Sequence, residues 1–433
     1  MYDARRSTPR TDHVLADPRL RDAASRLGDH LVKKAVGAAL ERCRAGDISP
    51  ADVADEALRL VPASATGMRA VVNATGVVVH TNLGRAPLSP AAVDAIGVAA
   101  GATDVELDLV TGRRDRRGRP TLAALAEAVP DAGAVHVVNN GAAALALVTC
   151  ALASGRTVVV ARGEMVEIGD GFRIPDLVES VGARLREVGT TNRVRLEDYA
   201  AAVDDETAFV LKVHPSNFVV SGFTSSVSVA ELSTLPVPVV VDIGSGLLAP
   251  HPRLPDEPDA ASSLRAGADL VTASGDKLLG GPQCGLMLGT AGLVEGLRRH
   301  PFARALRVDK LTLAALEATL TGPPTPVATA LAASVDSLLA RAGEVASALP
   351  SGLAAEAVRS TAAVGGGGAP GVEIPSAAVS LPAGLAGPLR VGEPPVVGHV
   401  ERGRLLLDLL TVAPDQDRLL VTAVRRAAAR PEG

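Results

Sequence analysis

Hydrophobic and polar positions follow two different patterns along this chain. In residues 12–60, apolar side chains recur at helical spacing, as at Val32, Val36 and Leu40. This spacing predicts a small unit of amphipathic helices. The following stretch, 62–67, has the sequence Pro-Ala-Ser-Ala-Thr-Gly, which is typical of a linker.

From about residue 70, short apolar runs of strand length alternate with helical segments. Continuous apolar strands separated by helices are typical of a parallel sheet that is covered on both faces. The fold class expected for this part is therefore α/β. The predicted strands are 135–138, 157–161, 185–188, 209–213, 237–243 and 270–273, and the predicted helices between them include 142–152 and 174–181.

A Gly-Pro-Pro-Thr-Pro sequence at 322–326 is the clearest break in the second half of the chain. Beyond it we expect a helix at 327–339, a glycine-rich loop at 365–371 and a strand at 405–411. The loop lacks a following lysine or serine and lies outside the α/β core, so we interpret it as a structural turn. The predicted domains are an N-terminal helical domain with its linker (1–70), an α/β core (71–322) and a smaller C-terminal α+β domain (323–433).

Composition narrows the class of protein. The chain has 433 residues, of which 47% are hydrophobic and 21% charged, which is ordinary for a globular protein. A net charge of −5 argues against a generally basic nucleic-acid coat. Residues 1–45, however, hold ten Lys or Arg against six Asp or Glu, a local charge of +4.

Cysteine usage and hydropathy bear on the expected compartment. The three cysteines lie far apart and form neither a disulfide framework nor zinc-binding spacing, which suits a reducing cytosol. We expect no signal peptide and no membrane span, because no sufficiently long apolar stretch occurs. A cytoplasmic protein is therefore expected.

A strand, a tight turn and a helix start meet at Asn139, Asn140, Gly141 and Ala142. Either asparagine can cap the helix, and the exposed N–H groups at the positive end of the helix dipole suit a phosphate. A simple connection between strand and helix is the alternative interpretation.

Two further positions carry candidate chemistry. Asp242 stands where an apolar strand ends, and a protonated pyridine nitrogen would be a fitting partner for it. Lys277 follows another strand and has small or apolar neighbours, so burial would lower the pKa of its amine and favour Schiff-base chemistry. Ser274 could add a hydroxyl to a phosphate. The alternatives are an aspartate that caps a turn and an ordinary surface lysine.

The order of these three features along the chain is similar to that in aminotransferase-like, fold type I enzymes, and predicts pyridoxal 5'-phosphate as the cofactor. Metal or nucleotide chemistry has no comparable support. The chain has no G-x-x-x-x-G-K-[ST] loop and no H-E-x-x-H motif, and its eight histidines form no obvious ligand cluster, so no metal site is expected.

Several arginines stand in positions suited to oxyanions. Arg85 lies in a turn bounded by glycine and proline, and Arg304 and Arg307 are three residues apart on one helical face. A guanidinium group matches phosphate-like oxygens. A hydroxyl-rich turn contains Thr190 and Thr191. Solvated loops are the alternative in each case.

Over nearly its whole length, the sequence resembles the bacterial selenocysteine synthases, the L-seryl-tRNA(Sec) selenium transferases. The resemblance is carried by VVNATGVVVHTNLGRAPLS (71–89), VVNNGAAALAL (137–147), ARGEMVEIGDGFRIPDLVESVGARLREVGTTNR (161–193), HPSNF (214–218), VVVDIGSGLL (239–248), DLVTASGDKLLGGPQCG (269–285) and FARALRVDK (302–310).

This resemblance implies a role for each matching residue. Lys277 matches the lysine that carries pyridoxal phosphate, Asp242 the partner of the pyridine nitrogen, and Asp276 an acidic neighbour that assists. The cofactor pocket would also include the turn at Asn140, Gly141 and Ala142, with Ser274. Positions that line the pocket for the selenium donor or the active site are matched by Arg85, Arg304, Arg307, Thr190, Thr191 and Asn217.

The resemblance also implies an activity and partners. Serine-charged tRNA(Sec) would be converted to selenocysteinyl-tRNA(Sec) through a cofactor-bound aminoacrylyl-tRNA, with selenophosphate as selenium donor. The family assembles as decamers, pentamers of dimers, with active sites between subunits, and its N-terminal helical domain grips the tRNA. The alternatives are a pyridoxal-phosphate lyase of the same family that acts on a free amino acid or amino-sugar acid, and a non-catalytic tRNA-binding protein.

Two positions depart from the family pattern. His399 and Leu410 stand where the resemblance leads us to expect arginines, which bears on a contact of the C-terminal domain. Cys284, seven residues after Lys277, is interpreted as a buried structural thiol.

Overall fold

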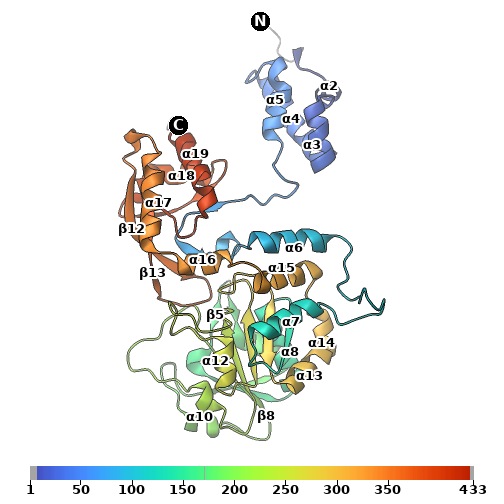
Figure 1. Cartoon of the computed structure of the whole chain (residues 1–433), viewed down its shortest axis with the longest axis vertical. Coiled ribbons are helices and arrows are strands. Elements are labelled where there is room, and N and C mark those ends of the chain that lie inside the picture. The colour runs from blue at the N-terminus through green and yellow to red at the C-terminus, as the bar shows by residue number, and fades with distance from the viewer. Residues whose placement is uncertain (1–6, 170, 430–433) are drawn as a thin grey trace. The chain divides into compact units, whose positions relative to one another are not determined.

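The computed structural model describes residues 7–169 and 171–429 (Figure 1). Contacts between residues divide the chain into two compact units, Met1–Ala70 and Val71–Gly433. None of the helices in the described part of the chain has the length and apolar character needed to cross a bilayer.

The first unit is helical, as its apolar spacing predicts. Leu20, Val32, Val36 and Leu40 are buried together in its core. The side chain of Asp17 caps a helix by accepting a hydrogen bond from Arg19 N (2.9 Å). The elements are α2 (Thr11–Leu15), α3 (Pro18–Leu27), α4 (Asp29–Ala45), the 3-10 turn η1 (Pro50–Asp52) and α5 (Val53–Leu60).

The second unit is built on a seven-stranded sheet of order β3-β11-β10-β9-β8-β4-β7. β11 pairs antiparallel with both neighbours, and the remaining pairs are parallel. This confirms the predicted α/β fold with a mostly parallel sheet. The strands are β3 (Ala134–Val138), β4 (Thr157–Ala161), β7 (Arg184–Val188), β8 (Thr207–Val213), β9 (Val239–Gly244), β10 (Leu270–Ser274) and β11 (Gly285–Gly289).

Alternate strand residues bury into two different apolar clusters, so both faces of the sheet are covered. In β9, Val239 and Val241 join one cluster and Val240 joins the other. One cluster is closed by α7 (Arg119–Ala128), α10 (Leu196–Ala200), α11 (Val229–Leu232), α12 (Ala260–Arg265) and α15 (Lys310–Thr321). The other is closed by α8 (Gly141–Ala153), α9 (Ile174–Ser180), α13 (Ala291–Arg299) and α14 (Pro301–Ala305).

Four further groups of elements lie within residues 81–173. They are η2 (Thr81–Leu83), α6 (Pro90–Ala100), η3 (Arg162–Glu164) and the two-stranded ribbon of β5 (Glu167–Ile168) and β6 (Phe172–Arg173).

A second, five-stranded sheet has the order β15-β16-β13-β12-β2, and a separate parallel pair joins β1 to β14. β1 (Val72–Asn73) and β2 (Val77–Val79) therefore pair with C-terminal strands, although the sequence analysis placed residues 72–79 in the core domain. The other strands are β12 (Glu356–Gly365), β13 (Glu373–Pro382), β14 (Val396–Val397), β15 (His399–Glu401) and β16 (Arg404–Asp408).

The C-terminal helices differ from the prediction in one place. The helix expected at 327–339 is two helices, α16 (Pro326–Ala332) and α17 (Val335–Ser347), because Ala333 and Ser334 between them are extended. The expected strand 405–411 ends at Asp408, whose carboxylate accepts a hydrogen bond from Leu410 N (3.0 Å). The remaining elements are η4 (Ser351–Leu353), η5 (Ala383–Leu385), α18 (Ala386–Arg390), η6 (Pro414–Gln416) and α19 (Asp417–Ala428).

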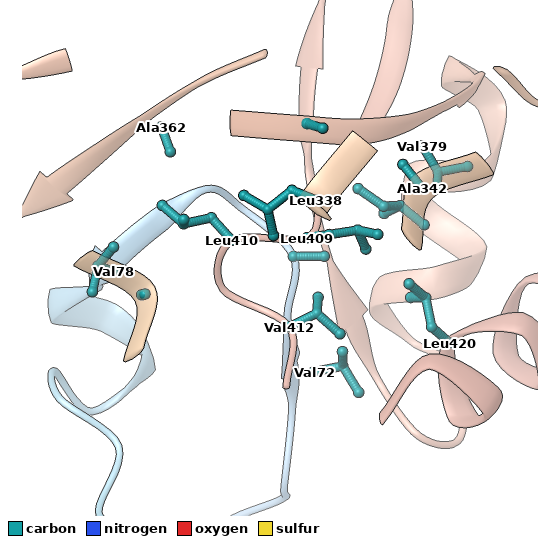
Figure 2. Packing of buried hydrophobic residues seen from close by; sticks show 14 of the residues in the cluster. Val72, Val78, Leu338, Ala342, Ala362, Val379, Leu409, Leu410, Val412 and Leu420 are labelled. Carbon is teal, nitrogen blue, oxygen red and sulfur yellow. The ribbon is translucent and has the colours of Figure 1, made fainter. Parts of the chain in front are cut away.

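An apolar core joins this second sheet to α17 and α19. Figure 2 shows Val72 and Val78 from the start of the unit packed with Leu338, Leu410 and Leu420 from its end. Leu410 is buried here, so the position where an arginine was expected is part of the apolar core. Burial of these side chains stabilises the attachment of the first strands of the unit to its last helices.

Candidate active site

The turn after β3 is built to receive an anion. Asn140 caps α8 by accepting a hydrogen bond from Ala143 N at its side-chain oxygen (2.8 Å). A Cβ atom at Gly141 would lie 2.6 Å from the hydroxyl oxygen of Ser274. Glycine at this position therefore leaves room for that hydroxyl at the N-terminus of a 13-residue helix. A phosphate fits these donors and the helix dipole.

Asp242 lies near the end of β9 and is paired in the sheet with Thr272 of β10. The Thr272 hydroxyl donates a hydrogen bond to the Asp242 carboxylate (2.8 Å). Burial raises the pKa of Asp242, while the Thr272 hydrogen bond and the charge of Lys277 act in the opposite direction. A cationic ring nitrogen would relieve the cost of burying this carboxylate.

Lys277 lies in the turn that follows β10 and is only 9% exposed. Burial lowers the pKa of its amine, and the charges of Asp242 and Asp276 oppose that effect. An amine with a lowered pKa is a better nucleophile at neutral pH.

Five of the predicted cofactor residues line one small cavity. They are Gly141, Ala142, Asp242, Ser274 and Lys277. The structure therefore brings together an anion-binding helix start, a carboxylate and a buried amine from three separate stretches of sequence. This donor set fits pyridoxal phosphate, which needs a phosphate site, a partner for its ring nitrogen and a lysine for its aldehyde.

Asp276 and Arg85 meet beside this cavity. The Arg85 guanidinium forms an ion pair with the Asp276 carboxylate (2.6 Å), and Ala86 N donates to Asp276 O (3.2 Å). Asp276 is 6% exposed, whereas the Arg85 side chain is 38% exposed. Arg85 thus neutralises a buried carboxylate next to Lys277 and still presents part of its side chain to solvent.

Arg304 and Arg307 lie elsewhere in the chain. They line a cavity of about 510 Å³ that shares no described residue with the one around Lys277. Arg307 contacts Glu106 (3.5 Å), which also pairs with Arg114 (2.9 Å) and Arg117 (3.1 Å). This second cavity, which we call the arginine cavity, is strongly basic and is lined by Glu106, Arg114, Asp115, Arg116, Arg117, His136, Arg298, Arg299, Arg304 and Arg307, among others.

Thr190, Thr191 and Asn217 do not line the cavity around Lys277 either. Both threonines line another cavity, of about 550 Å³. The Asn217 side chain donates a hydrogen bond to Glu167 O (2.8 Å). The cavity of the two threonines shares Val213 and His214 with the one around Lys277, and the roles expected for Thr190, Thr191 and Asn217 at the active site stay a prediction.

Four contributors to the site were not predicted from the sequence. The glycine-rich loop reaches Lys277, since a Cβ atom at Gly367 would lie 2.5 Å from the amine nitrogen. The loop is a turn, as expected from its sequence, but its approach to Lys277 was not predicted. His214, directly after β8, and Ser216 also line the cavity. Thr272, which supports Asp242, was hidden among the apolar residues of its strand.

Two further expectations concern cysteine and metals. Cys284 is buried, and burial raises the pKa of its thiol to about 12. This agrees with a structural thiol. Among residues 7–169 and 171–429, no group of three or more His, Cys, Asp or Glu side chains is arranged to hold a metal ion.

Comparison with known proteins assigns the chain to a family. Residues 71–413 match the profile described as "L-seryl-tRNA selenium transferase", and residues 5–44 match "Selenocysteine synthase N terminal". Among solved structures, a D-glucosaminate-6-phosphate ammonia-lyase is similar with a TM-score of 0.59 at 20% identity, over 84% of this chain and 96% of the other. That likeness supports the fold.

Curated relatives cover almost the full length. The L-seryl-tRNA(Sec) selenium transferase of Geobacter sulfurreducens is 40% identical, over 97% of this chain and 98% of the relative. That of Moorella thermoacetica is 42% identical, over 98% of this chain and 96% of the relative. The chain belongs to the L-seryl-tRNA selenium transferase family.

Proposed function

We propose that this protein converts L-seryl-tRNA(Sec) to L-selenocysteinyl-tRNA(Sec) with pyridoxal 5'-phosphate as cofactor and selenophosphate as selenium donor. The observation that carries the proposal is the single cavity that joins Gly141, Asp242, Ser274 and Lys277. The names of the full-length relatives supply the substrate.

Each cavity residue has a defined task in this proposal. The N-terminus of α8, capped by Asn140, and the Ser274 hydroxyl bind the cofactor phosphate. Asp242 keeps the ring nitrogen protonated, and Thr272 orients its carboxylate through the hydrogen bond of 2.8 Å. Lys277 forms the covalent link to the cofactor aldehyde. The cofactor, when bound, supplies an electron sink for the bond that breaks at the seryl α-carbon.

Proton transfer falls to Lys277. Burial lowers the pKa of the Lys277 amine, which favours its neutral, proton-accepting form whenever Nζ is not joined to the cofactor. Nζ then accepts the α-proton of the seryl group. Asp276 precedes Lys277 and is held in place by its ion pair with Arg85. Its negative charge stabilises the protonated form of Lys277 after the amine has accepted the proton.

The selenium donor requires cationic groups. Arg85 pairs with Asp276, the sequence neighbour of Lys277, and Arg304 and Arg307 line the arginine cavity. We propose that selenophosphate binds to these three guanidinium groups. Because Arg304 and Arg307 lie in a separate cavity of the same chain, the site would be completed in an oligomer, a decamer made of five dimers, in which a second copy contributes residues.

The N-terminal helical unit distinguishes the proposed selenium transferase from the alternative function, a lyase. A pyridoxal-phosphate lyase that acts on a free amino acid or amino-sugar acid has no need of such a unit. The match of residues 5–44 to "Selenocysteine synthase N terminal" favours a role in gripping tRNA(Sec). The excess of basic residues in this region agrees with phosphate contact.

The test is selenium incorporation from selenophosphate into purified seryl-tRNA(Sec). We expect selenocysteinyl-tRNA to form with the wild-type chain and not with Lys277→Ala. Ordinary seryl-tRNA(Ser) is the matched substrate control and should stay unconverted. Activity on free amino acids without any on seryl-tRNA(Sec) would replace the proposed function by the lyase.

A further inference from the structure

One buried carboxylate outside the proposed machinery touches two parts of the cofactor site. Glu257 lies just before α12, and its side chain is 1% exposed. Its Oε2 atom accepts hydrogen bonds from His214 Nε2 (3.1 Å) and from Ala369 N (2.6 Å). Its Oε1 atom has no hydrogen-bond partner within the described part of the chain.

The first of these contacts leads to the cofactor cavity through His214. This residue follows β8, and its backbone N–H donates to Asp242 O (3.0 Å). His214 lines the same cavity as Asp242 and Lys277. Because the Glu257 carboxylate accepts, the imidazole donates from Nε2, which fixes both its tautomer and the direction of its ring.

The second contact leads to Lys277 through the glycine-rich loop. Ala369 stands two residues after Gly367, whose α-carbon approaches Lys277 so closely that a Cβ there would lie 2.5 Å from Nζ. The hydrogen bond from Ala369 N to Glu257 is the contact that ties this loop to the segment before α12. The loop belongs to the C-terminal sheet, so Glu257 links that sheet to the cofactor cavity.

We propose that Glu257 is a positioning residue. One of its carboxylate oxygens, Oε2, holds the His214 imidazole at the cofactor cavity and also holds the glycine-rich loop against Lys277. The proposal rests on the proposed function only in that Lys277 carries the cofactor.

The cost of burial argues for a role beyond packing. A buried carboxylate is unfavourable unless it is paired, and here one oxygen takes both donors while the other takes none. An apolar residue or a glutamine would fill the same space with less cost in desolvation. The negative charge of Glu257 also acts on Lys277. Like the charges of Asp242 and Asp276, it raises the pKa of the Lys277 amine, whereas burial lowers it.

Two substitutions separate the hydrogen-bond acceptor from the charge. Glu257→Ala removes the oxygen that accepts from both His214 and Ala369. Glu257→Gln removes the charge but keeps an oxygen that can accept from Ala369 N. Asp256→Asn is the matched control, because Asp256 is the neighbouring acidic residue and is exposed.

The first measurement is hydrogen–deuterium exchange of residues 365–371 in the cofactor-free protein. We expect at least tenfold faster exchange of the Ala369 amide in Glu257→Ala, and wild-type exchange in Glu257→Gln and Asp256→Asn. The second measurement is a pH titration of the visible absorbance of the lysine–cofactor linkage. Its midpoint should shift to lower pH in Glu257→Gln and stay unchanged in Asp256→Asn.

The outcomes are distinguishable. A role in packing alone predicts that Glu257→Gln titrates like the wild type, and that result overturns the proposal. Unchanged exchange at Ala369 in a folded Glu257→Ala protein also overturns it. A wild-type chain without any cofactor absorbance would instead contradict the proposed function, while the exchange measurement would still report whether Glu257 holds the loop.

Discussion

Substitution of Gly367 by alanine tests how closely the glycine-rich loop packs on the proposed catalytic lysine. Gly367 has a φ of +84°, where an L-residue costs about 1–2 kcal/mol. The added Cβ would lie 2.5 Å from Lys277 Nζ and Cε, closer than the 3.0 Å below which real Cβ contacts essentially never occur. Because the obstructed atoms are the far end of a flexible side chain, Lys277 would move and the stability cost would stay near that of the backbone strain.

Gly403→Ala is the matched control. Gly403 has a similar φ of +74°, and no heavy atom would lie within 4 Å of its Cβ. Urea denaturation should therefore show losses of about 1–2 kcal/mol in the free energy of unfolding for both variants. Only Gly367→Ala should also lose the visible absorbance that appears when pyridoxal phosphate is added. Equal absorbance in the two variants would refute the close packing of the loop on Lys277.

Three further substitutions test individual interactions. Burial lowers the pKa of Lys277 below its ordinary value of 10.5, so the charged amine destabilises the folded, cofactor-free protein at neutral pH. Lys277→Met should therefore raise the free energy of unfolding measured in urea. The gain should shrink as the pH rises toward 10.5, where the amine loses its charge in the unfolded chain as well. Arg85→Ala leaves the Asp276 carboxylate unpaired and should lower the free energy of unfolding in urea. The loss should be smaller than the ~3–5 kcal/mol expected for a fully buried ion pair, because the Arg85 side chain is 38% exposed. Asn140→Ala removes the acceptor for Ala143 N and should cost about 1 kcal/mol in thermal or urea unfolding, whereas an unchanged stability would argue against the cap.

The chemistry of the site was largely predictable because its signals are local. Asp242 and Lys277 each follow an apolar run, and the turn before Gly141 couples a strand to a helix. In a parallel sheet, the carboxyl ends of strands meet at one edge, so residues far apart in sequence converge there. The structure places these residues in one cavity, as that rule predicts.

Contacts that depend on tertiary packing escaped prediction. The strands β12 and β13 have irregular burial patterns. β12 pairs with β2 from the start of the unit, and the loop that follows it approaches Lys277 through tertiary packing. Glycines in sequence indicate a turn but do not reveal what the turn approaches. Likewise, the spacing of Arg304 and Arg307 predicts one helical face, but that prediction is wrong: α14 ends at Ala305, and Arg307 forms an isolated bridge with Val138. Both arginines line the arginine cavity.

The site of attachment of the cofactor is the most direct test of this account. After incubation with pyridoxal phosphate, borohydride reduction makes the bond to a lysine permanent, and peptide mass spectrometry then locates it. The account predicts a pyridoxyl group on Lys277. A label on Lys212 or another lysine, or a chain that takes up no label, would contradict the central claim.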